Sequence, residues 1–297
     1  MKLTFLGTSC MVPTKQRNVS GMYLDFEGIG MLFDCGEGSQ RQMQIAGINR
    51  NSVKYIFISH WHADHVAGLL GLLQTITQAV DAITIVGPIE TKKRLDMLLN
   101  ATIWNMDIEI TVIEASHTKR QTVVDTDKFY VESMPLLHGI PCVGYSFVEK
   151  SRLRINTAAL KKHTIPSGPH LAALQRGEES VYEGKTLSVA DFTTKVAQKK
   201  FTYIADTKFT PTLVEFAQAA DVLVSEATYE DERAQNAEKY FHMTAAQAAT
   251  IAKDANVGKL YVTHISQRYK KTDTLAKQLR VVFPDSQVAE DFMSVKF

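Results

Sequence analysis

The sequence is poor in cysteine and tryptophan, has almost no net charge and contains no long apolar run. Its three cysteines, Cys10, Cys35 and Cys142, are far apart and form no CxxC pair, so we expect buried thiols and no disulfide framework. The longest apolar stretch, residues 66–76, contains glycines and is too short to cross a bilayer. The first residues are typical of a strand and turn and not of a signal peptide. These absences predict a cytoplasmic protein with no membrane segment.

The charge balance excludes a strongly basic surface over the whole molecule, because the net charge of the 297 residues is only +1. This is weak evidence against a nucleic-acid ligand, since a local basic surface is compatible with a neutral total. Residues 149–200 contain ten lysines and arginines against five acidic residues. This charge predicts an insertion that either contacts a polyanion or is a solvated excursion without a partner, and charge alone does not decide between them.

The order of apolar runs indicates a layered α/β fold around one core. The composition, 45% hydrophobic and 22% charged, is ordinary for a globular domain and sufficient for a large core. Short β-rich runs come first, and strands and helices alternate after them. We expect strands near 2–6, 20–26, 30–34, 55–58, 83–86, 110–113, 129–133, 143–148, 201–205, 222–224 and 259–262. We expect helices near 37–46, 65–78, 89–99 and 273–282.

The motif HWHADH at residues 60–65 stands between a strand-like run and a leucine-rich segment. Three imidazoles and one carboxylate so close together are costly in a core unless a cation such as zinc takes their lone pairs. His60 and His62 leave the strand and can point to one side, whereas Asp64 and His65 begin the next helix and can point to another. The turn can therefore serve two adjacent cations, as in hydrolases that attack phosphorus or a carbonyl. The alternative is a polar turn with surface histidines.

A turn with four donors needs further ligands from later in the chain. Several acidic and histidine residues follow predicted strands or begin the next helix: His138, Asp206, Glu226, His242 and His264. Because strand ends gather at one edge of a layered sheet, these side chains can converge on one cleft. Asp34 also ends a predicted strand, where it either orients a metal-binding histidine or caps the helix near 37–46. The loop PTKQRN at 13–18 is basic, and its composition alone is that of a solvated turn.

With HxHxDH followed by His138, Asp206 and His264 in this order, the sequence resembles the metallo-β-lactamase superfamily over most of its length. The resemblance extends to the ribonuclease Z family of tRNA 3′-processing endonucleases, through four segments: PTKQRN at 13–18, PSGP at 166–169, EAT at 226–228 and THISQRY at 263–269. It implies a single domain over residues 1–297 with a four-layer αββα sandwich, α/β (α+β) in class. It also implies that 149–200 contains an inserted basic tRNA-binding arm, or exosite.

The same resemblance implies two Zn²⁺ ions per subunit and seven ligands. One zinc would be held by His60, His62 and His138, the other by Asp64, His65 and His264, and Asp206 would bridge them. Asp64 would orient the nucleophile or accept its proton. His242, held by Glu226, would protonate the leaving 3′ oxygen, a task suited to an imidazole near neutral pH.

The implied substrate is precursor tRNA, cut after the discriminator base to leave a tRNA 3′-OH and a trailer with a 5′-phosphate. Lys15 and Arg17 would lie near the cleavage site and bind substrate. Recognition would depend on shape and phosphate, because an A-form helix hides its base edges. The protein would be a homodimer in which the arm of one subunit serves the active site of the other.

The sequence departs from the family pattern at Ala205, Ser225 and Met243, each of which stands next to a proposed site residue. These departures affect the hydrogen bonds around the ligands and the geometry of the proton donor. Two other functions compete with the endonuclease. A small-molecule phosphodiesterase or ester hydrolase of the same superfamily would share the metal site but have no use for a basic arm. An RNA-binding protein with structural zinc would need closed coordination, whereas seven ligands around two metals leave positions open.

Overall fold

The computed structural model describes residues 1–76, 82–103 and 108–297. The chain divides into two compact units. The core unit comprises Met1–Val124, Val131–Phe147 and Lys200–Phe297, and the insert unit comprises Asp125–Tyr130 and Val148–Lys199. Among the described residues, no helix is long and apolar enough to cross a membrane.

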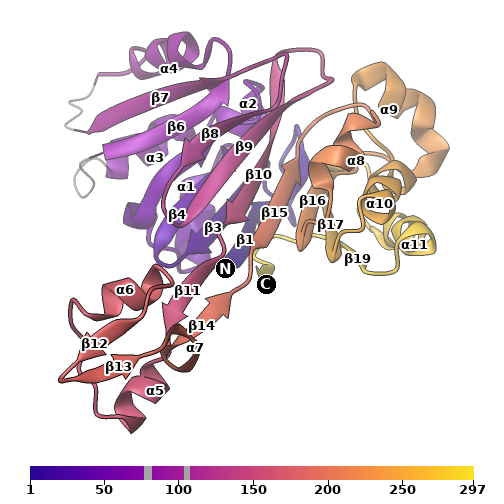
Figure 1. Cartoon of the computed structure of the whole chain (residues 1–297). Coiled ribbons are helices and arrows are strands. Elements are labelled where there is room, and N and C mark those ends of the chain that lie inside the picture. The colour runs from indigo at the N-terminus through magenta and orange to yellow at the C-terminus, as the bar shows by residue number, and fades with distance from the viewer. Residues whose placement is uncertain (77–81, 104–107) are drawn as a thin grey trace. The chain divides into compact units, whose positions relative to one another are not determined.

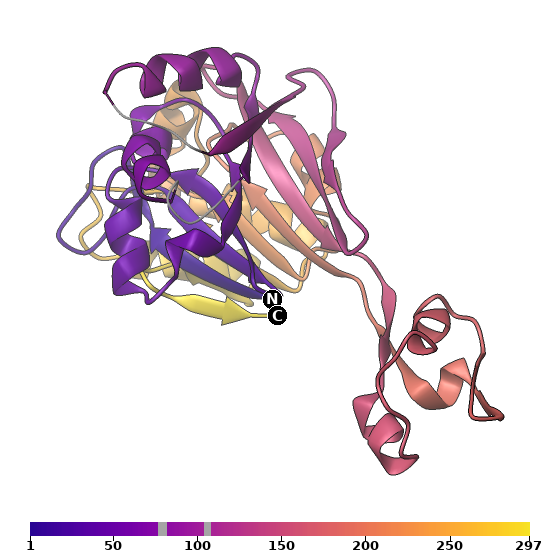
Figure 2. The same ribbon diagram turned by 90° about the vertical axis from the view of Figure 1, so that its left-hand side faces the viewer.

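The first sheet of the core unit has the strand order β20-β1-β3-β4-β5-β6-β7 (Figure 1). Its strands are β1 Lys2–Gly7, β3 Gly21–Phe26, β4 Ile29–Cys35, β5 Val53–Phe57, β6 Ala82–Pro88, β7 Glu109–Ala115 and β20 Ser294–Lys296. Because β1 pairs with β20, the two ends of the chain lie side by side (Figure 2). From β4 to β7 the neighbours are parallel, so the carboxyl ends of these strands share one edge.

The second sheet has the order β19-β17-β16-β15-β10-β9-β8. Its strands are β8 Gln121–Asp125, β9 Phe129–Leu136, β10 Cys142–Glu149, β15 Lys199–Ile204, β16 Val222–Glu226, β17 Lys259–Thr263 and β19 Ser286–Val288. The neighbours from β15 to β19 are parallel. A separate short pair joins β2 Ser9–Cys10 to β18 Ile265–Ser266 and ties the first loop to the segment after β17.

Aromatic side chains fill the space between the two sheets. Phe33 of the first sheet lies edge-on to Phe201 of the second, with ring centroids 5.2 Å apart. Phe57 and Tyr145 also meet across the sheets at 5.2 Å. Tyr145 is buried, and its hydroxyl donates to the carbonyl of Ile58 at 2.7 Å, so this polar atom is satisfied inside the core.

Helices cover the outer face of each sheet, which completes the four-layer αββα sandwich (Figure 1). The first sheet is accompanied by α1 Ser39–Ile45, η1 Arg50–Ser52, α2 Ala63–Val66, α3 Leu69–Ile76 and α4 Thr91–Leu99. The second is accompanied by α8 Thr212–Ala217, η2 Asp231–Arg233, α9 Ala234–Tyr240, α10 Ala245–Asp254 and α11 Asp273–Val282. A capping box between Thr244 and Gln247 fixes the start of α10 directly after His242. The predicted fold class is confirmed.

The insert unit has a small core of its own. In it β11 Arg152–Ile155 pairs with β14 Thr193–Val196, and β12 Ser180–Tyr182 pairs with β13 Lys185–Leu187, both antiparallel. Its helices are α5 Thr157–Lys162, α6 Leu171–Gln175 and α7 Val189–Phe192. A cluster of buried hydrophobic side chains forms this core: Leu160, Ile165, Leu171, Leu174, Leu187 and Phe192. The predicted arm, 149–200, lies almost entirely in this unit, and its role in binding tRNA stays a prediction.

The helix expected at 65–78 is wrong as a single element. It is divided into α2 and α3, and its last positions, 77 and 78, lie outside the described residues. The break occurs at Gly68, whose N–H donates to the carbonyl of Cys35 at 2.9 Å. A Cβ at Gly68 would lie 2.2 Å from the carbonyl oxygen of Gly36, so only glycine permits this close approach.

Candidate metal centre

The candidate site lies where strands of both sheets end. His60 and His62 follow β5, His138 follows β9, Asp206 follows β15 and His264 follows β17. The first two belong to the first sheet and the other three to the second. The structure therefore brings the seven residues proposed as ligands together at one edge of the sandwich, in two neighbouring donor groups. A third group, Asp206, His242 and His264, overlaps both of them.

The first donor group consists of His60, His62, His138 and Asp206, whose ligand atoms all lie within 4.8 Å of one another. His62 Nδ1 is 2.9 Å from His60 Nε2 and 3.3 Å from His138 Nε2. Asp206 Oδ2 is 3.7 Å from His60 Nε2. Imidazole nitrogens with a carboxylate oxygen are the donors that zinc prefers in proteins.

The second donor group consists of Asp64, His65 and His264, again within 4.8 Å. His264 Nε2 is 3.4 Å from His65 Nε2 and 3.4 Å from Asp64 Oδ2. All three residues are buried. Two imidazole nitrogens that face each other at this distance share a proton or a cation, because two free lone pairs repel.

Asp206 faces both groups. Its Oδ2 points toward His60, whereas its Oδ1 lies 3.7 Å from His65 Nε2 and 3.4 Å from His264 Nδ1. The residue is only 3% exposed, and Oδ1 has no hydrogen-bond partner among the described residues. An unsatisfied carboxylate oxygen is costly in a core, and a cation beside it removes that cost. The residues present therefore fit a divalent metal site.

The histidines of the first group are electrostatically suited to bind a cation. Burial, together with the charge of His65, lowers the pKa of His60 well below its usual value. Burial and the charge of His138 lower the pKa of His62, and burial lowers the pKa of His138 itself. These imidazoles are neutral at pH 7 and keep a free lone pair, which is the form that coordinates metals.

The second group is surrounded by acids. Burial lowers the pKa of His65, but Asp34 and Asp206 outweigh it and leave that pKa raised. Burial raises the pKa of Asp64, but a hydrogen bond from His264 and the charge of His65 leave it lowered. The lowered pKa values of Asp64 and Asp206 keep these two carboxylates ionised, and a bound cation would replace the protons on the imidazoles of this group.

Asp34 orients His65. Its completely buried carboxylate accepts hydrogen bonds from His65 Nδ1 at 2.8 Å, from Tyr203 Oη at 2.7 Å and from both the N–H and the hydroxyl of Ser59. Because Nδ1 donates to Asp34, Nε2 is the atom that would bind a cation once its proton is displaced. The helix-cap interpretation of Asp34 is wrong, since Gly38 precedes α1 and no side chain caps that helix.

Glu226 connects His242 to His264 through Thr228. Its Oε1 lies 3.0 Å from His242 Nδ1, and its Oε2 accepts the hydroxyl of Thr228 at 2.7 Å. Thr228 Oγ1 in turn lies 3.0 Å from His264 Nδ1 and can accept a hydrogen bond from the N–H of that ring. Burial lowers the pKa of His242, but Glu226 outweighs it and leaves that pKa raised. Thr207 N–H also donates to Glu226 at 3.0 Å, so the carboxylate is held from several sides.

Met11 holds the second group from the loop side. Its backbone N–H donates to Asp64 Oδ2 at 2.8 Å, and its φ of 58° lies in the left-handed region, which is unfavourable for methionine. Sequence reasoning missed this contact, as it missed Tyr203 and Thr207. A backbone donor leaves no trace in residue type, whereas Thr228 belongs to the EAT segment and could have been found there.

The structure separates the two basic residues of the 13–18 loop. Both line a cavity of about 420 Å³ next to the segment after β17. Lys15 is exposed. Arg17 is partly buried, and its Nη1 donates to Thr8 Oγ1 at 2.6 Å and to the carbonyl of Ala289 at 2.5 Å. Arg17 therefore supports the loop, and only Lys15 presents a free side chain to solvent.

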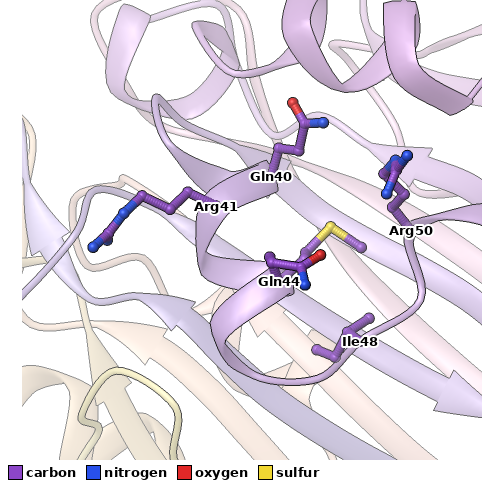
Figure 3. A pocket seen from close by; sticks show the side chains of 6 residues that line it. Gln40, Arg41, Gln44, Ile48 and Arg50 are labelled. Carbon is purple, nitrogen blue, oxygen red and sulfur yellow. The ribbon is translucent and has the colours of Figure 1, made fainter.

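A second cavity, of about 270 Å³, lies beside α1. It is lined by Gln40, Arg41, Met43, Gln44, Ile48 and Arg50 (Figure 3). In Figure 3 the Arg41 side chain points away from the other polar groups. This lining shares no residue with either donor group, so the cavity is separate from the candidate centre.

Comparisons with known proteins agree with the geometry. The model of the beta-lactamase superfamily domain matches residues 31–265. Ribonuclease Z of Archaeoglobus fulgidus is 36% identical over 99% of this chain and 97% of its own length, and ribonuclease Z of Bacillus cereus is 37% identical over 99% and 98%. The crystal structure of the short form of human tRNase Z is 27% identical, covers 100% of this chain and 99% of its own, and superposes with a TM-score of 0.75. The chain belongs to the ribonuclease Z family of the metallo-β-lactamase superfamily.

Proposed function

We propose that this chain is a zinc-dependent endoribonuclease that works in the cytoplasm and removes the 3′ trailer from precursor tRNA. The cut falls after the discriminator base and leaves a tRNA 3′-OH and a trailer 5′-phosphate. One observation carries the proposal: two imidazole-rich donor groups meet on Asp206, in a chain that matches ribonucleases Z along nearly its whole length.

The two donor groups would hold two zinc ions per subunit, and Asp206, which faces both groups, would be a ligand at each. The buried and unsatisfied Oδ1 of Asp206 supports this assignment, as do the lowered pKa values of His60, His62 and His138. When bound, such ions stabilise negative charge on a phosphodiester and lower the pKa of water.

Asp64 orients the attacking water and accepts its proton. Its Oδ2 is fixed by the N–H of Met11 and by His264, so the carboxylate cannot turn away from the centre. The lowered pKa of Asp64 keeps it ionised and able to accept a hydrogen bond from water.

His242 donates a proton to the leaving 3′ oxygen of the tRNA. Its Nδ1 is occupied by Glu226, which leaves Nε2 as the atom that faces substrate. Glu226 is completely buried and held by Thr207 and Thr228, so it fixes the orientation of the imidazole ring. An imidazole whose second nitrogen is held by a carboxylate is the usual arrangement for a histidine that transfers a proton.

Substrate binding involves the 13–18 loop and the insert unit. Lys15 contacts a phosphate near the cleavage site, and Arg17 holds the loop in shape through Thr8 and Ala289. In the insert unit, Lys161 and Lys162 are exposed at the end of α5 and contact the tRNA backbone away from the cut. The active form is a homodimer in which the insert unit of one subunit serves the centre of the other.

The test is cleavage of a 3′-extended precursor tRNA by metal-loaded protein, with and without a chelator, and mapping of both product ends. A chelator-sensitive cut after the discriminator, with 3′-OH and 5′-phosphate ends, is expected. Asp64→Ala should abolish the cut while the fold is retained. Chelator-sensitive turnover of small phosphodiesters without any cut in the precursor would instead assign a small-molecule hydrolase.

A further inference from the structure

The half-buried Phe241 lies beside His138, with Lys208 against its ring, and the exposed rings of Phe209 and Tyr240 are their direct neighbours in the sequence. None of the steps above uses these four side chains. We call Lys208, Phe209, Tyr240 and Phe241 the aromatic rim. Phe209 is 37% exposed and Tyr240 is 49% exposed. Exposed aromatic rings add little to the core, and these two stand in the segments that adjoin Asp206 and His242, where a ligand of the centre can reach them.

Contacts connect the rim to the metal centre. The backbone carbonyl of Phe241 accepts a hydrogen bond from His138 Nδ1 at 3.2 Å, and the Phe241 ring lies 6.4 Å from the His138 ring. Phe241 directly precedes His242 and has a φ of 60°, a strained conformation for a non-glycine residue. The chain is thus held in an unfavourable conformation at the point where the rim meets the proposed proton donor.

The rim also carries positive charge. The Lys208 ammonium lies 4.4 Å from the centre of the Phe241 ring and forms an ion pair with Glu238. The Lys239 ammonium lies 5.3 Å from the centre of the Tyr240 ring. Aromatic faces interleaved with lysines are typical of surfaces that bind unpaired nucleotides, because bases stack on the rings and phosphates meet the cations.

The reaction decides which nucleotide this is. A proton donor must lie within hydrogen-bond reach of the atom that it protonates. If His242 protonates the leaving 3′ oxygen, the nucleoside that carries this oxygen lies beside His242 and therefore beside Phe241. An unpaired base can be splayed out and stacked on a protein ring, whereas a paired base in an A-form helix cannot.

We propose that the aromatic rim binds the unpaired nucleotide that carries the leaving 3′ oxygen, by stacking of its base and by contact of Lys208 with a phosphate. The proposal rests on the proposed function and assigns it a specificity site for one nucleotide. This site acts on RNA only and contributes nothing to the turnover of a small phosphodiester.

The test uses Phe209→Ala and Tyr240→Ala, singly and together, because both rings are exposed and their removal leaves the core intact. Val281→Ala is the matched control, since Val281 is 77% exposed on α11. Each protein is assayed on a 3′-extended precursor tRNA and on bis(p-nitrophenyl) phosphate. Two further precursors carry one abasic ribonucleotide, at the discriminator or at the first trailer position.

The double variant should raise KM for the precursor about tenfold, the size of one lost base-stacking contact, and leave bis(p-nitrophenyl) phosphate turnover unchanged. With the unchanged protein, the precursor with an abasic discriminator should have a higher KM than the intact precursor. With the double variant, the two precursors should have the same KM. Equal losses on both substrates, or a full abasic penalty in the double variant, would overturn the proposal. The proposal would also be overturned if the double variant lost the effect of the abasic site only in the precursor that carries it at the first trailer position. Failure of the unchanged protein to cut any precursor would instead refute the proposed function.

Discussion

At the scale of single residues, Asp34 holds His65 through a carboxylate that is 0% exposed. Asp34→Asn places an amide N–H₂ against hydrogen-bond donors, so we expect zinc affinity to fall roughly 10–100-fold. Competition with a fluorescent zinc chelator measures this change. Tyr203→Phe is the matched control, because it removes one donor and leaves the carboxylate in place. Unchanged affinity in Asp34→Asn would show that His65 needs no such support.

The thiols give a prediction that depends on pH. Burial raises the pKa of Cys35 to about 12 and raises that of Cys142 well above its usual value. A raised pKa lowers the thiolate fraction, so at pH 8 an aromatic disulfide reagent should titrate at most Cys10 in the native protein and all three thiols after unfolding. Fast reaction of two thiols without unfolding would contradict the burial.

The same pKa determines how Cys35 affects stability. Its folded-state pKa of about 12 exceeds the ordinary value of 9.0, so between these pH values the folded state binds more protons than the unfolded state. The contribution of Cys35 to stability is therefore complete below about pH 9 and is lost as the pH rises toward 12. Urea unfolding at several pH values measures this: in Cys35→Ala, the free energy of unfolding should fall less steeply above about pH 9 than in the unchanged protein.

Residue types and spacing predicted which donors could meet, because HxHxDH and the acidic strand ends are local patterns. Among the supports of those donors they offered Asp34 as one of two alternatives, but they did not predict Tyr203 or Met11. Tyr203 reaches Asp34 from the opposite sheet, and Met11 uses a backbone N–H. Both contacts depend on how distant segments pack, which a single sequence does not show.

At the scale of elements, the break between α2 and α3 offers a matched pair of glycines. Gly68→Ala should destabilise the fold by roughly 1–3 kcal/mol, because its Cβ would lie 2.2 Å from the Gly36 carbonyl oxygen. Gly71→Ala should stabilise it by about 0.5–1 kcal/mol, because Gly71 is exposed in α3 with its nearest contact at 3.5 Å. Urea unfolding measures both. Equal effects of the two changes would refute the close approach at Gly68.

Elements with strong local signals were predictable. The helix expected at 273–282 is α11, with the same bounds, and the strand expected at 259–262 is β17 with one more residue. Elements with weak apolar patterns were not predicted, among them α8 and α9. The predicted helix at 65–78 failed because its break at Gly68 depends on a contact with the distant Cys35, which the local apolar pattern does not show.

At the scale of the whole molecule, the insert unit can be removed cleanly. Ile155 and Thr193 face each other as paired residues of β11 and β14, so a short Gly-Ser turn can replace residues 156–192. The core unit should fold, turn over bis(p-nitrophenyl) phosphate at an unchanged rate and bind precursor tRNA at least tenfold more weakly, roughly the effect of losing a few phosphate contacts. A control with Lys161→Ala and Lys162→Ala alone should lose part of that affinity. Equal loss of both activities would refute binding away from the cut.

The donor groups combine residues of both sheets. His60 and His62 follow a strand of the first sheet, whereas His138 and Asp206 follow strands of the second. Because a ligand that binds only the folded state stabilises it, zinc at about 100 times its Kd should add about 2.7 kcal/mol to the free energy of unfolding. Thermal unfolding with and without chelator measures this, and an unchanged Tm would contradict a site shared by the two sheets.

Because the donor groups combine residues of both sheets, the lifetime of the protein should depend on the supply of metal. Without the ion, the edge of the sandwich at which strands of both sheets end would open more often, and transiently opened chains are the ones that proteases degrade. If the centre holds zinc as proposed, the cell would therefore lose the protein as well as its turnover during zinc starvation. Recovery would then wait for new synthesis, so tRNA maturation would resume later than zinc itself returns.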